Sequence, residues 1–294
     1  MLQLGEHRLR MVSGGDFRLD GGAMHGVVPK TIWSRLVGCD EHNRVAYSTN
    51  CLVVDTPGGE RVLVETGNGD KFSAKERAIY GIEQQGCLLR ALAAESIAPE
   101  SIDVVIMTHL HFDHAGGAVR RDDGGALAPV FPRARHVVQR RELEDALHPH
   151  ERNRASYLIE NIEPLLEAGR LEAVDGEVEV ARGVTVVPTP GHTLGHQSVR
   201  IDGIGGIGGA SGAGRRALFL GDVVPTAVHV RLPFIMAYDL DVVGTLETKR
   251  QLWKQALAEN WLLVFGHELE THAGYLGLDA KGQYTIHQPV QLAA

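Results

Sequence analysis

The stretch of sequence that decides the fold is Thr108-His109-Leu110-His111-Phe112-Asp113-His114. It follows directly on the apolar run 103–107 (Asp-Val-Val-Ile-Met), whose composition is typical of a strand buried on both faces. Three histidines and an aspartate, with no thiolate among them, are ligand types that suit zinc, iron, cobalt or manganese. A strand end that opens into a loop can direct neighbouring side chains toward one point, whereas a regular helix cannot do so at spacings of two. The stretch therefore predicts a metal centre directly after a buried strand.

Three other apolar runs end in the same way. The run 186–191 leads to His192, the run 218–221 leads to Asp222, and the run 262–266 leads to His267. In each, a predicted buried strand ends and a metal-binding type of side chain follows. Rigid strand ends provide the preorganisation that a metal site needs. The candidate ligands are therefore His109, His111, Asp113, His114, His192, Asp222 and His267.

The remaining patterns predict strands interspersed with helices, and hence an α/β fold. We expect strands at 50–54, 61–65, 103–107, 184–187, 217–220 and 261–265, with a hairpin turn at 56–59, and helices at 83–96, 140–147, 151–168 and 244–259. The glycine-rich segment 203–214 is predicted to be a flexible loop, because ordering glycine costs much backbone entropy. No repeat or linker divides the chain, so we expect one domain over residues 1–294.

Composition narrows the range of partners. The chain has 294 residues, 44% of them apolar, and a net charge of −8 without a basic cluster, which disfavours nucleic acid as a partner. No apolar run approaches the ~18–20 residues that cross a bilayer, so no membrane association is expected. The three cysteines, Cys39, Cys51 and Cys87, form no recognisable disulfide framework, which favours a cytoplasmic location.

The motifs resemble those of the metallo-β-lactamase superfamily. They are H-x-H-x-D-H at 109–114, T-P-G-H at 189–192, G-D at 221–222 and a late histidine at 267, in the order typical of the superfamily. The resemblance spans roughly residues 45–270 and implies a four-layer αββα sandwich with two metal ions at one edge of its sheets. It also implies that His109, His111 and His192 hold one metal ion. Asp113, His114 and His267 would hold the second, and Asp222 would bridge the two.

The resemblance implies hydrolysis. Two metal ions, most simply two Zn²⁺ with iron, cobalt or manganese as alternatives, would share a water, lower its pKa toward neutrality and polarise a carbonyl or phosphoryl oxygen. The bridging hydroxide would then attack the substrate. Asp113 is expected to carry a proton to the leaving group, and Tyr238 to donate a hydrogen bond to a developing oxyanion.

Several other side chains have predicted roles. Glu65 stands where the superfamily usually has an aspartate, and we expect it and His196 to support the ligands. The candidates for the wall of the substrate pocket are Met24, Trp33, Phe112, Phe234, Met236 and Tyr238. The remaining histidines are expected at the surface: His7, His25, His42, His136, His148, His150, His272 and His287. His229 is left open between the surface and the pocket.

Two runs narrow the resemblance further. Phe-Gly-His-Glu at 265–268 and the turn at 189–198 look most like the acyl-homoserine lactonase and methyl-parathion-hydrolase-like branch. Lactonases often have a tyrosine three residues after the bridging aspartate; here Pro225 takes that position, and Tyr238 is a possible substitute. A small-molecule lactone or carboxylic ester is the first expectation for the substrate. The alternatives are an organophosphate phosphotriesterase, a glyoxalase-II-like thioesterase, for which the tail 270–294 is short, and a non-catalytic metal-binding module. Apolar loops near the N-terminus are a candidate homodimer surface.

Overall fold

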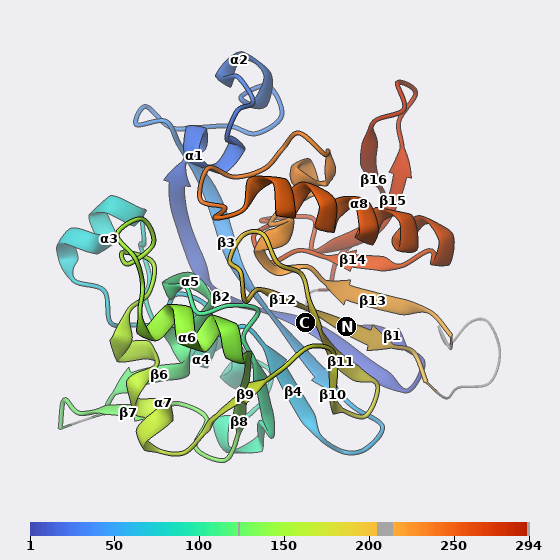
Figure 1. Cartoon of the computed structure of the whole chain (residues 1–294). Coiled ribbons are helices and arrows are strands. Elements are labelled where there is room, and N and C mark those ends of the chain that lie inside the picture. The colour runs from blue at the N-terminus through green and yellow to red at the C-terminus, as the bar shows by residue number, and fades with distance from the viewer. Residues whose placement is uncertain (123, 205–213, 293–294) are drawn as a thin grey trace.

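Two seven-stranded sheets form the centre of the molecule in the computed structural model, which describes residues 1–122, 124–204 and 214–292 (Figure 1). In spatial order, the first sheet contains β1 (Leu2–Leu4), β2 (His7–Asp20), β3 (Arg44–Asp55), β4 (Arg61–Val64), β5 (Val104–Ile106), β8 (Arg135–Gln139) and β9 (Leu171–Val174). The second contains β10 (Val178–Ala181), β11 (Val184–Pro188), β12 (Gln197–Asp202), β13 (Arg216–Phe219), β14 (Leu262–Val264), β15 (Ala273–Leu278) and β16 (Tyr284–Val290). β6 (Val119–Arg121) and β7 (Leu127–Pro129) form a separate hairpin.

Successive side chains of each strand point to opposite faces of its sheet, and this alternation produces separate apolar layers on the two faces. On β3, Leu52 and Val54 point between the sheets, where they join Val186 and Phe219 of the second sheet in one buried core. Cys51, also on β3, points to the opposite face and belongs to a second core. The sheets therefore pack face to face, and each needs helices over its outer face.

The helices supply the two outer layers. On the first sheet, α4 (Cys87–Ala94) contributes Leu88 and Leu92 to the outer core, and α6 (Arg140–Leu147) contributes Ala146. On the second sheet, α8 (Val242–Glu259) buries Leu252 and Trp253 (Figure 1). Shorter helices are α1 (Gly21–His25), α2 (Lys30–Trp33), α3 (Ala74–Tyr80), α5 (Phe112–Ala115) and α7 (Glu163–Glu167). The predicted four-layer αββα sandwich is confirmed.

The predicted strands are confirmed, five of them to within a residue at each end, as are helices α6 and α8 to within two residues; the strand predicted at 50–54 is longer than expected, since β3 begins at Arg44. The helix predicted at 151–168 is wrong, because that segment contains turns, a 3₁₀ turn at Ile159–Asn161 and only the short α7. Pro164 lies in the first turn of α7, where its missing N–H costs nothing, and so it marks a helix start. The predicted helix at 83–96 is shorter than expected, since α4 begins at Cys87. Most of the predicted glycine-rich loop, 205–213, lies outside the described residues.

Three of the histidines expected at the surface are instead fully buried, namely His7, His25 and His136. Strand pairing brings the His7 Nε2–H to the Arg182 carbonyl at 2.9 Å, and the His25 ring stacks on Trp33 with centroids 4.8 Å apart. No helix in the described part of the chain is long and apolar enough to cross a membrane.

Candidate metal centre

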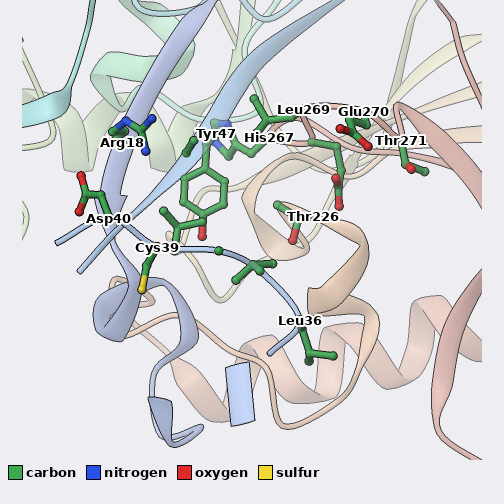
Figure 2. A pocket seen from close by; sticks show the side chains of 15 residues that line it. Arg18, Leu36, Cys39, Asp40, Tyr47, Thr226, His267, Leu269, Glu270 and Thr271 are labelled. Atoms are coloured by element: carbon green, nitrogen blue, oxygen red, sulfur yellow. The ribbon is translucent and has the colours of Figure 1, made fainter. Parts of the chain in front are cut away.

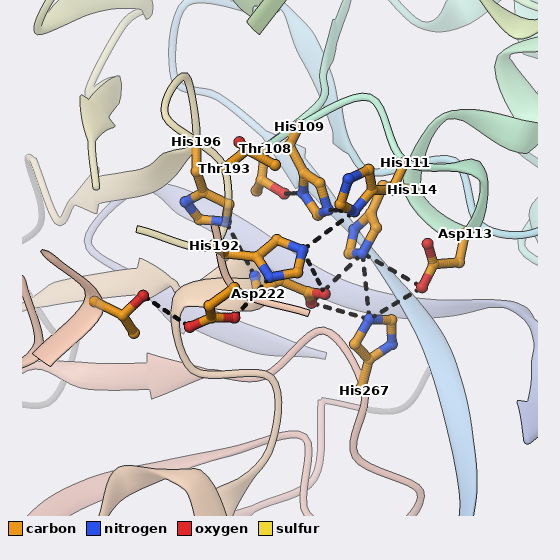
Figure 3. Close-up of polar contacts among 12 residues, drawn as sticks. Thr108, His109, His111, Asp113, His114, His192, Thr193, His196, Asp222 and His267 are labelled. Carbon is orange, nitrogen blue, oxygen red and sulfur yellow. Dashed lines mark hydrogen bonds and ion pairs between the residues drawn. The ribbon is translucent and has the colours of Figure 1, made fainter. Parts of the chain in front are cut away.

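The seven candidate ligands come together where four strands end (Figure 3). His109 and His111 follow β5, and Asp113 and His114 lie on the single turn α5. The remaining three follow the ends of β11, β13 and β14: His192, Asp222 and His267. All seven side chains are buried. The two sheets thus deliver ligands from segments far apart in the sequence to one edge of the sandwich.

The first cluster consists of His109, His111 and His192, whose ligand atoms all lie within 4.8 Å of one another. The His111 Nδ1 atom is 3.0 Å from His109 Nε2 and 3.1 Å from His192 Nε2. Zn–N bonds of about 2.0–2.1 Å in a tetrahedral site place two nitrogens roughly 3.3 Å apart. These three nitrogens are therefore spaced to hold one ion.

The second cluster consists of Asp113, His114, Asp222 and His267. The Nε2 atoms of His114 and His267 are 3.2 Å apart, and Asp113 Oδ2 is 3.6 Å from each of them. Asp222 Oδ1 is 3.0 Å from His267 Nε2. Two imidazoles and two carboxylates are a donor set that suits zinc and the harder transition metals.

Asp222 lies between the two clusters. Its Oδ1 atom faces the second cluster, 3.4 Å from His114 Nε2, and its Oδ2 atom faces the first, 3.5 Å from His192 Nε2. One carboxylate with an oxygen toward each cluster is the arrangement that a residue bridging two ions requires.

The hydrogen bonds on the far side of the rings fix which nitrogen carries the proton. His192 Nδ1–H donates to Asp239 Oδ1 at 2.9 Å, and His267 Nδ1–H donates to the Ser48 carbonyl at 2.8 Å. His114 Nδ1 faces Glu65 Oε2 at 3.4 Å. With Nδ1 engaged in this way, His114 and His267 turn their Nε2 atoms toward one another at 3.2 Å, an arrangement that a cation between them would stabilise. The residues present fit two metal ions.

Electrostatics agree with this reading. Burial, followed by the nearby imidazoles of His114 and His111, holds the pKa of His109 well below its usual value, so this ring stays neutral. Burial would raise the pKa of Asp222, but His267 and His114 lower it well below its usual range.

Burial would also lower the pKa of three other imidazoles, but nearby carboxylates outweigh it. Asp113 and Asp222 raise the pKa of His114 well above its usual value. Asp239 and Asp222 raise the pKa of His192, and Asp222 raises that of His267. The carboxylates therefore draw positive charge into the site, and a bound metal ion would supply that charge in place of protons.

The two predicted supporting residues lie where expected. Glu65 accepts a hydrogen bond from the Thr108 backbone N–H at 3.1 Å through Oε1, while its Oε2 faces His114. His196 Nε2 accepts from the Asp222 backbone N–H at 3.0 Å, and its Nδ1 contacts Thr189 Oγ1 at 2.8 Å. These contacts orient the ligands and their loops.

Close packing around Asp222 also requires a particular neighbour. Gly221 has a φ of +58°, and a Cβ there would lie 2.7 Å from His196 Nε2 and 2.8 Å from Thr108 Oγ1. Only glycine combines this backbone conformation with such close contacts. The G-D pair is thus a structural requirement of the site.

Sequence reasoning missed two buried carboxylates. Asp239, which is 1% exposed, holds His192 through Oδ1 and accepts from Thr245 Oγ1 through Oδ2 at 2.7 Å. Glu142, fully buried on α6, is the second. It accepts hydrogen bonds from the Leu110 N–H, Tyr157 O–H and Thr193 O–H groups. Glu142 thereby joins the loop after β5 to the turn after β11. Neither carboxylate stands in a recognisable motif, so no local signal marked it.

The apolar residues expected in the pocket wall are mostly core. Four of them are 1–6% exposed and pack in one buried cluster with Phe17: Met24, Trp33, Phe234 and Met236. Phe112 packs on Phe72 and Tyr80, with ring centroids 5.5 and 4.8 Å away. His229 is also core, since its Nε2–H donates to the Met24 carbonyl at 2.8 Å. Tyr238 is 39% exposed.

Comparison with known proteins places these features in a family. A sequence profile described as the metallo-β-lactamase superfamily matches residues 44–267. An N-acyl homoserine lactonase from Bacillus sp. is 30% identical over 238 residues, which cover 76% of this chain and 82% of that protein. A solved structure of a probable metal-dependent hydrolase from Staphylococcus aureus superposes with a TM-score of 0.86 at 26% identity, covering 98% of this chain and 100% of that one. The dizinc quorum-quenching lactonase AidC shares the fold, with a TM-score of 0.75 at 19% identity over 99% of this chain and 97% of that one.

The fold and the two clusters of donors define a metal-dependent hydrolase. The chain belongs to the metallo-β-lactamase superfamily, and its curated relatives include N-acyl homoserine lactonases.

Proposed function

We propose that this chain opens lactones or cleaves carboxylic esters of small molecules at a centre of two metal ions. The observation that carries the proposal is the position of Asp222, which has one carboxylate oxygen toward each of two ligand clusters. The similarity to a lactonase over three quarters of the chain supports an ester bond of the lactone type as substrate.

The proposed ligands of the first ion are His109, His111 and His192, and those of the second are Asp113, His114 and His267, with Asp222 shared. Zn²⁺ suits these nitrogen and oxygen donors, and iron, cobalt and manganese suit the same set. When bound, the ions supply a water activated for attack near neutral pH and Lewis-acid polarisation of the substrate carbonyl.

Two side chains are proposed to act on the reacting groups. Asp113, whose Oδ2 faces His114 and His267, would take a proton and deliver it to the leaving alkoxide. The pKa of Tyr238 is raised to about 12, first by burial and then by Asp20, so its phenol stays protonated. Tyr238 can then donate a hydrogen bond to the oxyanion that forms as the carbonyl is attacked.

The decisive experiment combines turnover with metal analysis. The purified protein would be tested on N-acyl homoserine lactones of several acyl lengths, a δ-lactone, paraoxon and lactoylglutathione, with the metal-to-protein ratio determined. His109→Ala is expected to lose metal and lactone turnover together. His287→Ala, which changes an exposed histidine on β16, is the matched control and should keep both.

Each alternative has its own outcome. Turnover of paraoxon alone would indicate a phosphotriesterase, and turnover of lactoylglutathione alone would indicate a thioesterase. Two bound ions with no turnover on the whole panel would indicate a metal-binding module and contradict the proposal. The single domain, the cytoplasmic location and the homodimer stay predictions.

A further inference from the structure

The two ligand clusters differ in what lies next to them. A cavity of about 610 Å³ borders the second cluster, and His267 is the candidate ligand in its wall (Figure 2). Helix α6 lies next to the first cluster, because Glu142 near its start contacts residues adjacent to the histidines. A Cβ at Gly195 would collide with the Glu142 backbone nitrogen, so the turn after β11 packs directly on α6. The first cluster is thus supported by packed protein.

His111 is supported differently from the other two histidines of the first cluster. His109 Nδ1 contacts Thr108 Oγ1 at 3.0 Å, and His192 Nδ1–H donates to Asp239. His111 instead turns its Nδ1 toward the cluster, and its buried Nε2 has no hydrogen-bond partner among the described residues. A histidine that binds a metal is almost always oriented by a hydrogen bond from its other nitrogen. For His111, the orientation of the ring must therefore come from packing.

Tyr157 supplies that packing. Its ring is 5% exposed and meets the His111 ring with centroids 4.8 Å apart and an interplanar angle of 60°. The Tyr157 hydroxyl donates to Glu142 Oε1 at 2.8 Å, and the Leu110 backbone N–H donates to the same oxygen at 3.0 Å. Leu110 lies between His109 and His111 in the chain. One carboxylate oxygen therefore fixes both the backbone before His111 and the ring that packs on it.

The other oxygen of Glu142 reaches the third histidine. Glu142 Oε2 accepts a hydrogen bond from the Thr193 hydroxyl at 2.6 Å, and Thr193 directly follows His192. Glu142 is fully buried, so a donor that lost this acceptor would find no water to replace it. A single side chain thus contacts the supports of all three histidines.

We propose that Glu142 is the positioning residue for the ion held by His109, His111 and His192. It acts through Leu110, Tyr157 and Thr193 and does not touch the ion. The inference rests on the two ligand clusters of the proposed function, and it adds a determinant of the affinity for the first ion.

The geometry of the hydrogen bonds, and not the negative charge, carries this role. In Glu142→Gln, the side-chain oxygen still accepts from the Leu110 N–H and the Tyr157 O–H, and the NH₂ group donates to Thr193 Oγ1. Glu142→Ala removes all three contacts. Tyr157→Phe keeps the ring on His111 and removes only the hydroxyl that anchors it.

The test measures the affinity of these variants for Zn²⁺ by competition with a chromophoric chelator, together with the metal-to-protein ratio of the full chain. Glu142→Ala is expected to bind the first ion about 10-fold to 100-fold more weakly and the second ion as the wild type does. Glu142→Gln should restore most of that loss, and Tyr157→Phe should give an intermediate loss. Glu144→Gln, at an exposed position of α6, is the matched control and should bind both ions as the wild type does.

Two further measurements separate positioning from folding. The visible spectrum of the Co²⁺-loaded protein should change in Tyr157→Phe, because the His111 ring shifts at the first ion. The Tm of the metal-free protein should be the same in Tyr157→Phe and wild type to within a few degrees, so this variant decides the matter even where Glu142→Ala folds poorly.

The outcomes distinguish this role from the proposed function. Wild-type affinity for both ions in Glu142→Ala and Tyr157→Phe would refute the role of Glu142, as would an equal loss of both ions. Failure of Glu142→Gln to restore affinity would show that charge matters and contradict the geometric role. Two bound ions in a wild type without lactone turnover would refute the proposed function and leave the role of Glu142 to stand on the titrations. A wild type that binds no metal ion would refute both.

Discussion

Asp239→Asn tests how strongly a buried carboxylate outside the ligand set controls the metal centre. Asp239 accepts two hydrogen bonds, from His192 Nδ1–H and from Thr245 Oγ1–H. Asparagine keeps the shape, but its amide presents one oxygen and one NH₂ group, so one of the two donors loses its acceptor. The variant also removes the negative charge that raises the basicity of the His192 ring.

The expected loss is about 10-fold to 100-fold in metal affinity, or roughly 1.4–2.7 kcal/mol, at the cluster of three histidines. The second cluster does not contact Asp239, so one ion per chain should remain. A competition titration against a chromophoric chelator, together with the metal-to-protein ratio, measures both steps. Asp241→Asn makes the same chemical change at the exposed cap of α8, where asparagine caps equally well, and should behave as wild type. Wild-type metal affinity in Asp239→Asn would refute the reasoning.

Two further predictions concern stability. Gly221→Ala should lower the free energy of unfolding by about 2 kcal/mol or more and reduce metal content, because its Cβ would meet His196. Gly169→Ala is the control, since Gly169 has a φ of +61° and an added Cβ there would have no atom of the described residues within 4 Å; thermal denaturation should show a cost of only about 1 kcal/mol there. Burial lowers the pKa of Lys249 to about 7 in the folded protein. Between pH 7 and the ordinary lysine pKa, Lys249 is therefore protonated in the unfolded chain but neutral in the folded one. The free energy of unfolding consequently rises with pH across this range. Lys249→Met should lose the rise in Tm between pH 7 and 9, whereas Lys254→Met, at an exposed position of α8, should keep it. The same dependence of Tm on pH in Lys249→Met as in the wild type would contradict the prediction.

Much of the fold follows from local pattern. The apolar runs before His109, Asp222 and His267 each form a buried strand, and each ligand lies just beyond its end. A strand buried on both faces needs an unbroken apolar run, and such runs can be recognised in a single sequence. The order and spacing of the ligand motifs likewise depend only on neighbouring residues.

The residues that sequence reasoning misjudged depend on contacts between distant segments. Asp239 holds His192 from 47 positions away, and Glu142 meets Thr193 from 51 positions away. His136 is buried inside β8, although nothing in its local sequence distinguishes it from an exposed histidine.

The sequence by itself determined the set of candidate ligands, the strands that carry them and the class of fold, because side-chain periodicity and residue type encode burial and donor chemistry locally. Only the tertiary structure decided which carboxylates orient the candidate ligands and which apolar residues belong to the core. The physical reason is that periodicity specifies that a face of a strand or helix is buried, but not which other element packs against it. The hydrogen bonds between distant side chains depend on that packing of the two sheets and their helices.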